Sequence, residues 1–178
     1  WERPEISASS LAFIQYTSGS TSQPKGVMVS HGNLLHNVAD IEALTKRALR
    51  MASWLPASHD MGLIGGLLYP VYVGGHETLI SPMHFLQRPI RWLQVISRYR
   101  SESSPGPNFA YDLCVDKSTD ADRAGLDLSS WRCALNGAES VRSSTLDRFC
   151  AAFAPAGFKR SSFAPCYGLA EATLMITG

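Results

Sequence analysis

The sequence predicts an α/β layered fold, in which a sheet has helices packed against it. Two observations carry this prediction. Short apolar runs typical of β-strands alternate along the 178 residues with segments whose apolar side chains recur near every 3.6 residues. Glycine- and hydroxyl-rich turns follow several of the apolar runs, which is where open α/β sheets bind ligands. The chain is also long enough to form one domain with a core.

The first half of the chain is expected to alternate strands with helices. Its predicted strands are the apolar runs 11–16, 27–29, 52–55 and 77–80. Ser30 is suited to cap a helix whose apolar residues recur at helical spacing through Leu44. The uncharged stretch 61–75 contains five glycines and predicts a buried helix. Ser81–Pro82 predicts a turn, and Pro89 suits the first turn of a helix that continues to Tyr99.

The second half continues the alternation. Ser101–Gly106 predicts a polar turn, and the charged stretch Lys117–Asp127 predicts an excursion over the surface. Strands are predicted at 133–135 and 163–166, and a helix is predicted to begin at Leu169. A further helix is predicted from four apolar side chains on one face, Leu146, Phe149, Cys150 and Phe153.

The loop after the first predicted strand is suited to bind polyphosphate. It reads Thr17, Ser18, Gly19, Ser20, Thr21, Ser22, Gln23, Pro24, Lys25 and Gly26. Its hydroxyls can donate to phosphate oxygens, its glycines allow close approach, and its lysine adds a positive charge. A flexible linker is the alternative, but linkers seldom separate two β-like runs. Because Lys25 precedes Gly26 and no Ser or Thr follows the lysine, the loop is not a Walker phosphate loop.

Two further turns follow predicted strands, Asn136-Gly137-Ala138-Glu139 and Tyr167-Gly168-Leu169-Ala170-Glu171. Ligands of open α/β sheets gather at the carboxyl ends of the strands, so we expect both turns and the phosphate loop to meet in one cleft. Glu171 is a candidate Mg²⁺ ligand, although a carboxylate favoured by the dipole of the predicted helix is the simpler interpretation. Tyr167 could stack on a base or lie in the core. An ordinary strand-to-helix turn also explains Asn136–Gly137.

His59 and Asp60 follow a predicted strand and precede the glycine-rich helix. A lone histidine is more often structural than catalytic, and Asp60 is suited to orient His59 or to cap the helix. No G-x-S-x-G motif accompanies them. Several apolar residues could line an acyl tunnel, although core packing explains each one separately: Met61, Leu63, Ile64, Leu67, Leu68, Phe109 and Tyr111.

Composition excludes several classes of protein. The net charge of +1 comes from scattered Lys and Arg, which argues against a nucleic-acid partner. The uncharged apolar run 61–75 is too short to span a membrane, and no signal peptide is recognisable, so we expect no transmembrane segment. The four cysteines form no C-x-x-C pair, which favours reduced thiols in a cytoplasmic protein.

Three motifs in order resemble the adenylate-forming superfamily of acyl-CoA ligases, nonribosomal-peptide adenylation domains and luciferases. They are TSGSTSQPKG at 17–26, WLPASHDMGLIGG at 54–66 and YGLAEATL at 167–174. The wording of the second and third, with NFAYDLC at 108–114, is most similar to the fatty acyl-AMP ligase branch. The resemblance runs from about Leu11 to the end of the chain.

The resemblance implies roles for individual residues. The loop from Thr17 to Lys25 would hold the β- and γ-phosphates of ATP, and Glu171 would be the Mg²⁺ ligand. Tyr167 and the turn Asn136–Glu139 would hold adenine, while His59 would lie where the acyl carboxylate meets the α-phosphate. Many relatives carry Thr where this chain has Ala170, so a hydroxyl that could touch the α-phosphate is missing and Thr173 is the candidate substitute.

The resemblance also implies a reaction, in which a fatty acid attacks ATP, releases pyrophosphate and forms an acyl-adenylate for transfer to an acyl-carrier protein. A fatty acyl-CoA ligase is the near alternative, and a non-catalytic nucleotide- or lipid-binding module is the distant one. Residues 1–178 would form part of the large N-terminal domain. The small C-terminal domain and the family's ribose-binding aspartate motif are absent, so we expect this piece alone to be inactive or impaired.

Overall fold

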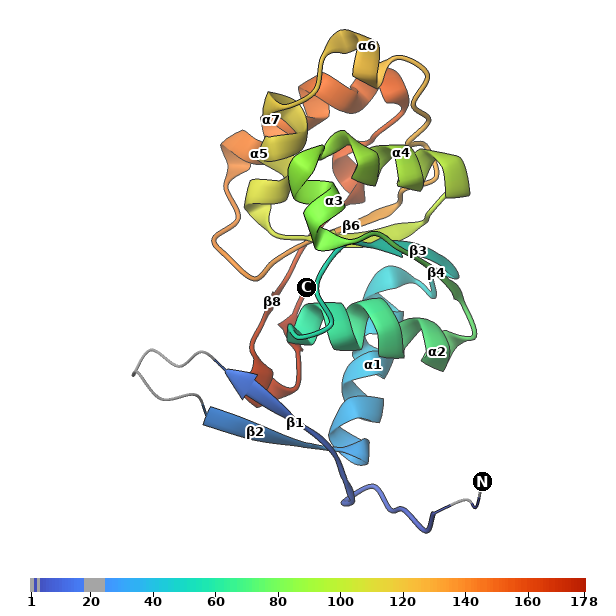
Figure 1. The fold of residues 1–178 in the computed structure, drawn as a ribbon, viewed down its shortest axis with the longest axis vertical. Helices are drawn as coiled ribbons and strands as arrows, with labels where there is room; N and C mark the ends of the chain where they lie inside the picture. Colours follow the sequence, from blue (N-terminus) through green and yellow to red (C-terminus); the bar gives the residue numbers. More distant parts are fainter. Residues whose placement is uncertain (1, 3, 18–24) are drawn as a thin grey trace.

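The computed structural model describes residues 2, 4–17 and 25–178, and its centre is a parallel sheet of five strands (Figure 1). The strand order is β4-β3-β5-β6-β7. The strands are β3 (Arg50–Ser53), β4 (His76–Leu79), β5 (Ser103–Gly106), β6 (Cys133–Asn136) and β7 (Phe163–Pro165). Because all five are parallel, their carboxyl ends lie along one edge of the sheet. The predicted α/β layered fold is confirmed.

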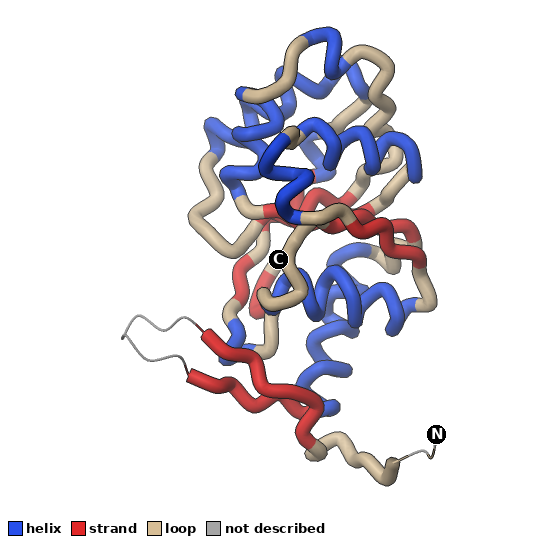
Figure 2. Tube along the Cα trace, in the orientation of Figure 1, coloured by secondary structure: helices blue, strands red, loops and turns tan. Residues whose placement is uncertain are grey.

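One face of the sheet is covered by a helical layer with an aromatic core (Figure 2). The layer contains α3 (Pro82–Gln87), α4 (Ile90–Tyr99), α5 (Asn108–Asp116), α6 (Asp120–Arg123), α7 (Ser143–Phe153) and the 3₁₀ turns η2 (Ala154–Ala156) and η3 (Arg160–Ser162). The rings of Trp92 and Trp131 are both buried, with centroids 5.2 Å apart. Phe149 and Phe153 lie on the buried face of α7, as the apolar spacing predicts. The surface excursion at 117–127 is largely exposed and includes α6.

The opposite face packs against α1 (His31–Thr45), η1 (Met61–Leu68) and α2 (Tyr69–Val73). Ser30 caps α1 as predicted, because its Oγ accepts a hydrogen bond from the backbone N–H of Asn33 at 3.1 Å. In return, Asn33 Oδ1 accepts a hydrogen bond from the Ser30 N–H. The glycine-rich stretch is helical as predicted, but η1 is a π-helix, in which the Tyr69 N–H donates to the carbonyl of Ile64. No helix in the described ranges is long and apolar enough to cross a membrane.

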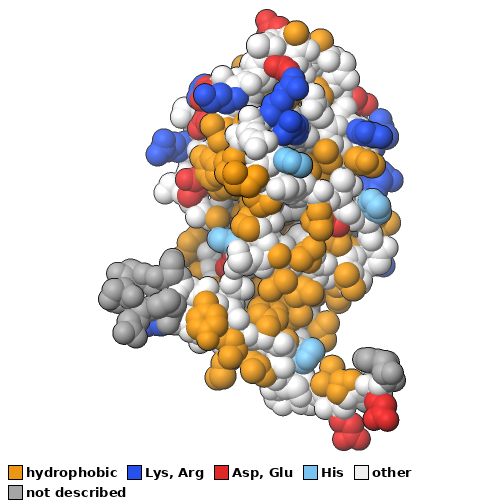
Figure 3. Space-filling view, viewed as in Figure 1, with side chains coloured by type: hydrophobic (Ala, Val, Ile, Leu, Met, Phe, Trp, Pro, Cys, Tyr) orange, Lys and Arg blue, Asp and Glu red, His pale blue; other side chains and the backbone are white. Residues whose placement is uncertain are grey.

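Two antiparallel hairpins lie beside this second layer. In the first, β1 (Leu11–Thr17) pairs with β2 (Lys25–Ser30) and projects from the body in Figure 1. In the second, β8 (Tyr167–Gly168) pairs with β9 (Met175–Thr177) around the 3₁₀ turn η4 (Ala170–Ala172). In Figure 3, hydrophobic side chains gather over the lower part of the view, which holds the hairpins and the layer of α1, η1 and α2. Lys and Arg lie mainly over the upper helical layer.

The prediction of a polar turn at Ser101–Gly106 is wrong, because residues 103–106 form the buried central strand β5. The Ser104 hydroxyl accepts a hydrogen bond from Trp92 Nε1 at 2.7 Å and donates to the carbonyl of Ala52, so its polarity is satisfied inside the core. A Cβ on Gly106 would lie 2.8 Å from the Trp92 ring. The small polar residues of β5 therefore make room for a tryptophan packed on the sheet.

Two other local predictions are also wrong. The segment after Ser81 is a helix, α3, because Pro82 begins it rather than turning the chain. No helix begins at Leu169: the Ala172 N–H bonds back to Leu169 in a single 3₁₀ turn, and Thr173 then adopts a φ of 74° that ends it. A Cβ on Gly168 would overlap the carbonyl oxygen of Leu174, so the glycine lets β9 fold back tightly. The helix dipole therefore does not explain Glu171.

Candidate functional site

A cavity of about 210 Å³ lies between the sheet and the layer formed by α1, η1 and α2. One end opens at the carboxyl edge of the sheet and is lined by four residues of the predicted site, His59, Ala138, Tyr167 and Gly168. The walls are mostly apolar and include Gly65 of η1 and Met61, which is one of the residues predicted to line an acyl tunnel. We call this space the main cavity.

Other candidates for the tunnel belong elsewhere. Ile64 and Tyr111 are fully buried core residues, as the simpler interpretation held, and Phe109 is exposed in the first turn of α5. Gly66 brings η1 close to Ser53, since a Cβ there would lie 3.2 Å from the Ser53 Oγ. The glycines of η1 therefore serve tight packing against the sheet as well as the cavity wall.

His59 and Asp60 form a hydrogen-bonded pair at the mouth of the main cavity. His59 Nδ1 lies 2.7 Å from Asp60 Oδ1, and this hydrogen bond raises the pKa of His59 despite partial burial, which acts in the opposite direction. Asp60 also accepts a hydrogen bond from the Met61 N–H at 2.6 Å at the start of η1, so it both orients His59 and caps the helix. The amide of Gln15 donates to the carbonyl of Ser58 at 3.0 Å and links this loop to β1.

The turn after β6 has a backbone shaped by close contact. A Cβ on Gly137 would lie 2.7 Å from the carbonyl oxygen of Cys166, so only glycine fits there without movement. Ala138 has a φ of 68°, an uncommon conformation for alanine. Such strained residues cluster at ligand sites. Ala138 faces the main cavity, which supports the candidate adenine-binding turn.

The side chains that flank this turn are used for structure. The Glu139 carboxylate accepts a hydrogen bond from the Phe109 N–H at 2.6 Å, at the start of α5. Asn136 alternates with Leu135, a residue of the cavity wall, so its side chain faces the other side of the sheet. Its two amide atoms are buried without a hydrogen-bond partner among the described residues, and its carbonyl accepts from the Cys166 N–H at 2.9 Å.

A second cavity, of about 200 Å³, joins the turn around Glu171 to β2 and α1. Its lining includes Ala170, Glu171 and Thr173 on one side and Asn33 on the other. Glu171 is exposed, whereas Ala170 and Thr173 are buried. Asn37 fixes this arrangement, because its amide donates to the Met175 carbonyl at 2.7 Å and accepts from the Met175 N–H at 3.0 Å.

The phosphate-loop prediction falls partly outside the described residues. The predicted phosphate-binding residues outside the described ranges are Ser18, Gly19, Ser20 and Thr21. Thr17 and Lys25 are paired where β1 ends and β2 begins. Gly26 packs against β1, since a Cβ there would lie 2.8 Å from Ile14 Cγ2. Because Val27 lines the second cavity with Glu171, the start of β2 and the Glu171 turn lie on the same side of the molecule.

The far end of the main cavity carries polar groups that the sequence did not reveal. Thr45 Oγ1 and the Tyr69 hydroxyl are hydrogen-bonded at 2.5 Å, and both residues are buried. Glu77 also lines this end, and its Oε1 is buried without a hydrogen-bond partner among the described residues. Burial raises the pKa of Glu77 to about 8. A lone glutamate in a four-residue edge strand gives no sequence signal for such a position.

We expect Glu77 to make the protein less stable as pH rises. Below about pH 4, both folded and unfolded states hold the carboxyl proton, and between about pH 4 and 8 only the folded state keeps it. Above the folded pKa, the full cost of burying the charge opposes folding and lowers the free energy of unfolding by up to about 5 kcal/mol. Urea titrations across this range should show a steeper decline for the unsubstituted protein than for Glu77→Gln; parallel curves would contradict the assignment.

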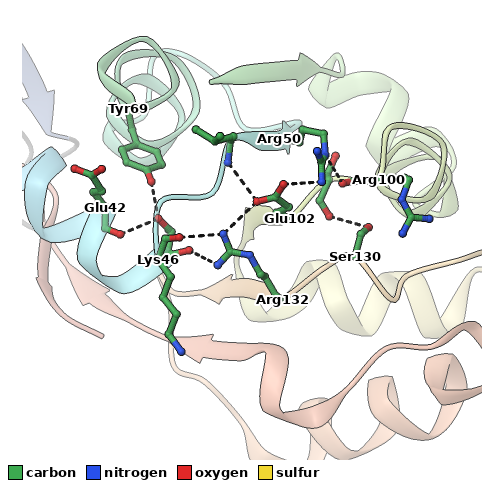
Figure 4. A network of polar contacts seen from close by, with 11 residues as sticks. Glu42, Lys46, Arg50, Tyr69, Arg100, Glu102, Ser130 and Arg132 are labelled. Atoms are coloured by element: carbon green, nitrogen blue, oxygen red, sulfur yellow. Dashed lines mark hydrogen bonds and ion pairs between the residues drawn. The ribbon is translucent and has the colours of Figure 1, made fainter. Parts of the chain in front are cut away.

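An ion-pair network lies at the amino ends of the strands (Figure 4). Arg132 donates to the carbonyls of Thr45 at 2.6 Å and Lys46 at 3.1 Å, at the end of α1. The Glu102 carboxylate pairs with Arg132 at 3.1 Å and with Arg50 at 2.7 Å. The network therefore links the end of α1 to the amino ends of three strands, opposite the edge that carries His59.

All four cysteines are free thiols. Burial raises the pKa of Cys166 to about 11 and also raises those of Cys114, Cys133 and Cys150, so none is an activated thiolate. No group of three His, Cys, Asp or Glu side chains suited to a metal occurs within the described ranges. Mg²⁺ needs fewer, since it commonly binds one or two carboxylates together with substrate phosphates. Exposed Glu171 fits that requirement.

The chain is similar to several characterised proteins. The profile of the AMP-binding enzyme family matches residues 2–178. JamA, a medium-chain-fatty-acid–[acyl-carrier-protein] ligase of Moorena producens, is 52% identical over 99% of this chain and 30% of its own length. A 4-hydroxyphenylalkanoate adenylyltransferase of Mycobacterium tuberculosis is 42% identical over 99% of this chain and 28% of its own.

A solved structure is also similar to this chain. The crystal structure of a fatty acyl-adenylate ligase from L. pneumophila, in complex with acyl adenylate and pyrophosphate, matches with a TM-score of 0.96 and 50% identity. The match covers 100% of this chain and 32% of that one. The chain thus spans about 30% of the length of the relatives it matches.

Proposed function

Because this chain belongs to the AMP-binding enzyme family, we propose that the protein carrying it activates a fatty acid with ATP and passes the acyl group to an acyl-carrier protein. The observation that carries the proposal is the main cavity, a mostly apolar space whose mouth is lined by His59, Ala138 and Tyr167. Such a space suits an acyl chain whose carboxylate lies at the carboxyl edge of the sheet, where α/β folds bind nucleotides.

The proposed reaction is adenylation. A carboxylate oxygen of the fatty acid attacks the α-phosphorus of ATP, the bond from that phosphorus to the bridging oxygen breaks, and pyrophosphate leaves with the bonding electrons. Catalysis of this kind rests on positioning and on neutralising charge. The protonated imidazole of His59, held by Asp60, would stabilise negative charge at the reacting centre. A raised pKa keeps more of this imidazole protonated near neutral pH.

Other residues would bind the nucleotide. Tyr167, with 62% of its surface exposed beside the main cavity, has a ring face available for adenine, and the turn Asn136–Glu139 offers backbone groups next to it. The loop from Thr17 to Lys25, ending in Gly26, would hold the β- and γ-phosphates. Glu171 would hold Mg²⁺, which neutralises phosphate charge when bound. Gly168, Ala170 and Thr173 would shape the turn that presents Glu171.

The acceptor and the setting are also proposals. The acyl-carrier protein is favoured over CoA because JamA and a second relative, TtuA of Teredinibacter turnerae, carry that acceptor in their names. The free cysteines favour the reducing cytoplasm, where ATP is available. Residues 1–178 would be part of a large N-terminal domain, with a small C-terminal domain supplied by the rest of the protein.

The test uses the full-length protein with labelled fatty acid, ATP, Mg²⁺ and either CoA or a carrier protein bearing phosphopantetheine. We expect pyrophosphate release and label on the carrier protein. Abundant acyl-CoA would identify a fatty acyl-CoA ligase instead. A protein that binds an acyl-adenylate mimic but releases no pyrophosphate with any fatty acid would be a binding module.

A further inference from the structure

The polar far end of the main cavity has no role in the reaction proposed above. Strand register places it: Glu77 pairs with Met51, and Met51 pairs with Ser103 across the sheet. Paired residues of neighbouring strands face the same side, and all three line the main cavity. They belong to the early part of their strands, whereas His59 and Ala138 follow strand ends. The cavity therefore runs from the reacting centre at one edge toward Glu77 at the other.

The far end of the main cavity is lined by polar as well as apolar side chains. The Thr45–Tyr69 hydroxyl pair forms part of its lining. Behind Thr45, Arg132 and Glu102 link the end of α1 to the amino ends of the strands (Figure 4). A chain that is bound by its carboxylate beside His59 consequently presents its distal end to this group of residues.

Glu77 differs from its neighbours in the hydrogen bonding of one carboxyl oxygen. Thr45 and Tyr69 satisfy each other, whereas Glu77 Oε1 is buried without a partner among the described residues. A buried polar atom without a partner lowers stability, so such groups are usually matched by a ligand or by water. A methyl end placed against Glu77 would leave the carboxyl unmatched, while a hydroxyl would both donate to it and accept from it.

We propose that Glu77 determines specificity for the distal end of the acyl chain and that the substrate is a fatty acid with a hydroxyl group at that end. The inference rests on the proposed adenylation reaction, because the carboxylate must lie beside His59 for the distal end to reach Glu77. A site built to hydrogen-bond a hydroxyl rejects the analogue that lacks it. An amino group fits less well, because burying an ion pair carries the desolvation cost of two charges.

The experiment is ATP–pyrophosphate exchange by the full-length protein with medium-chain acids and ω-hydroxy acids matched in chain length. At the length that reaches Glu77, we expect kcat/KM for the hydroxy acid to exceed that of the unsubstituted acid by roughly tenfold to a hundredfold. Glu77→Leu should reverse this preference. Glu77→Gln, whose amide also donates and accepts, should keep it and shows that a change at the position does not itself abolish folding.

Thr78→Val is the matched control, since Thr78 is the next residue of β4, faces the other side of the strand and also has a buried oxygen without a partner among the described residues. It should leave the ratio unchanged. Equal use of both acids, a ratio insensitive to Glu77→Leu, or a preference for ω-amino acids would overturn the inference. If no acid of either kind supports ATP–pyrophosphate exchange, both the proposed function and this inference are overturned.

Discussion

Glu171→Gln is expected to lower the rate of pyrophosphate release by at least about a hundredfold at ordinary Mg²⁺ concentrations. The substitution keeps the shape of the side chain and removes its negative charge, which a hard cation requires. Glu171 is exposed on the 3₁₀ turn η4 and packs no core, so the fold should survive. The measurement is steady-state pyrophosphate release as Mg²⁺ is titrated, and the variant should need more Mg²⁺ for half-maximal activity.

The control for this prediction is Asp40→Asn, which makes the same change of charge on the exposed side of α1. Its activity and Mg²⁺ dependence should match those of the unsubstituted protein. Thermal unfolding without substrates should be similar for all three proteins. Glu171 makes no salt bridge within the described ranges, and the Asp40–His36 pair is exposed, so its loss should cost little. Normal activity of Glu171→Gln with an unchanged Mg²⁺ titration would remove the proposed cation site.

His59→Gln is expected to lower kcat for adenylation by about a hundredfold while leaving KM for ATP nearly unchanged. The positive imidazole is proposed to stabilise charge that develops at the reacting centre, so its loss should affect the transition state more than the ground state. His84→Gln is the control, because His84 is exposed on α3 over the other face of the sheet. Equal loss in both variants would point to a general effect on folding.

The pH dependence gives a second measurement on the same pair. Asp60 raises the pKa of His59 through a hydrogen bond, so the imidazole keeps its proton to higher pH than a free histidine. Activity that needs the protonated form should fall as pH rises through this raised pKa. Asp60→Asn, which can still cap η1, should move the fall to lower pH. A pH profile that stays in place would mean that His59 does not act in its charged form.

The sequence predicts much of the fold because its local signals agree with the tertiary packing. Ser30 and the helical spacing after it locate α1 to within a residue. The apolar runs locate β3, β4, β6 and β7 to within a few residues. Placing the candidate turns after strand ends predicts that they meet in one cleft. Ala138 and Tyr167 do line one cavity, whereas Glu171 lines the second cavity. These signals are short-range, and the parallel sheet brings strand ends together without further information.

The missed features depend on contacts between distant residues. Strand β5 is polar in sequence, and only its packing beneath Trp92 and beside Ala52 makes Ser104 a core residue. The end of the chain folds back because Asn37 holds Met175, a contact across 138 positions. Glu77 gains its cavity position from register with Met51. The pattern of apolar residues along the sequence does not predict which distant residues pair.

Helix α1 contributes to both cavities: Asn33 and Asn37 line the second cavity with Glu171, and Ile41 and Thr45 line the main cavity. A rigid displacement of this helix would therefore alter the two binding spaces together. Redesigning the enzyme for bulkier or longer acids should accordingly rely on trimming individual side chains such as Ile41 or Met51. Moving the backbone of α1 would widen the main cavity, but it would also disturb the place proposed for the triphosphate.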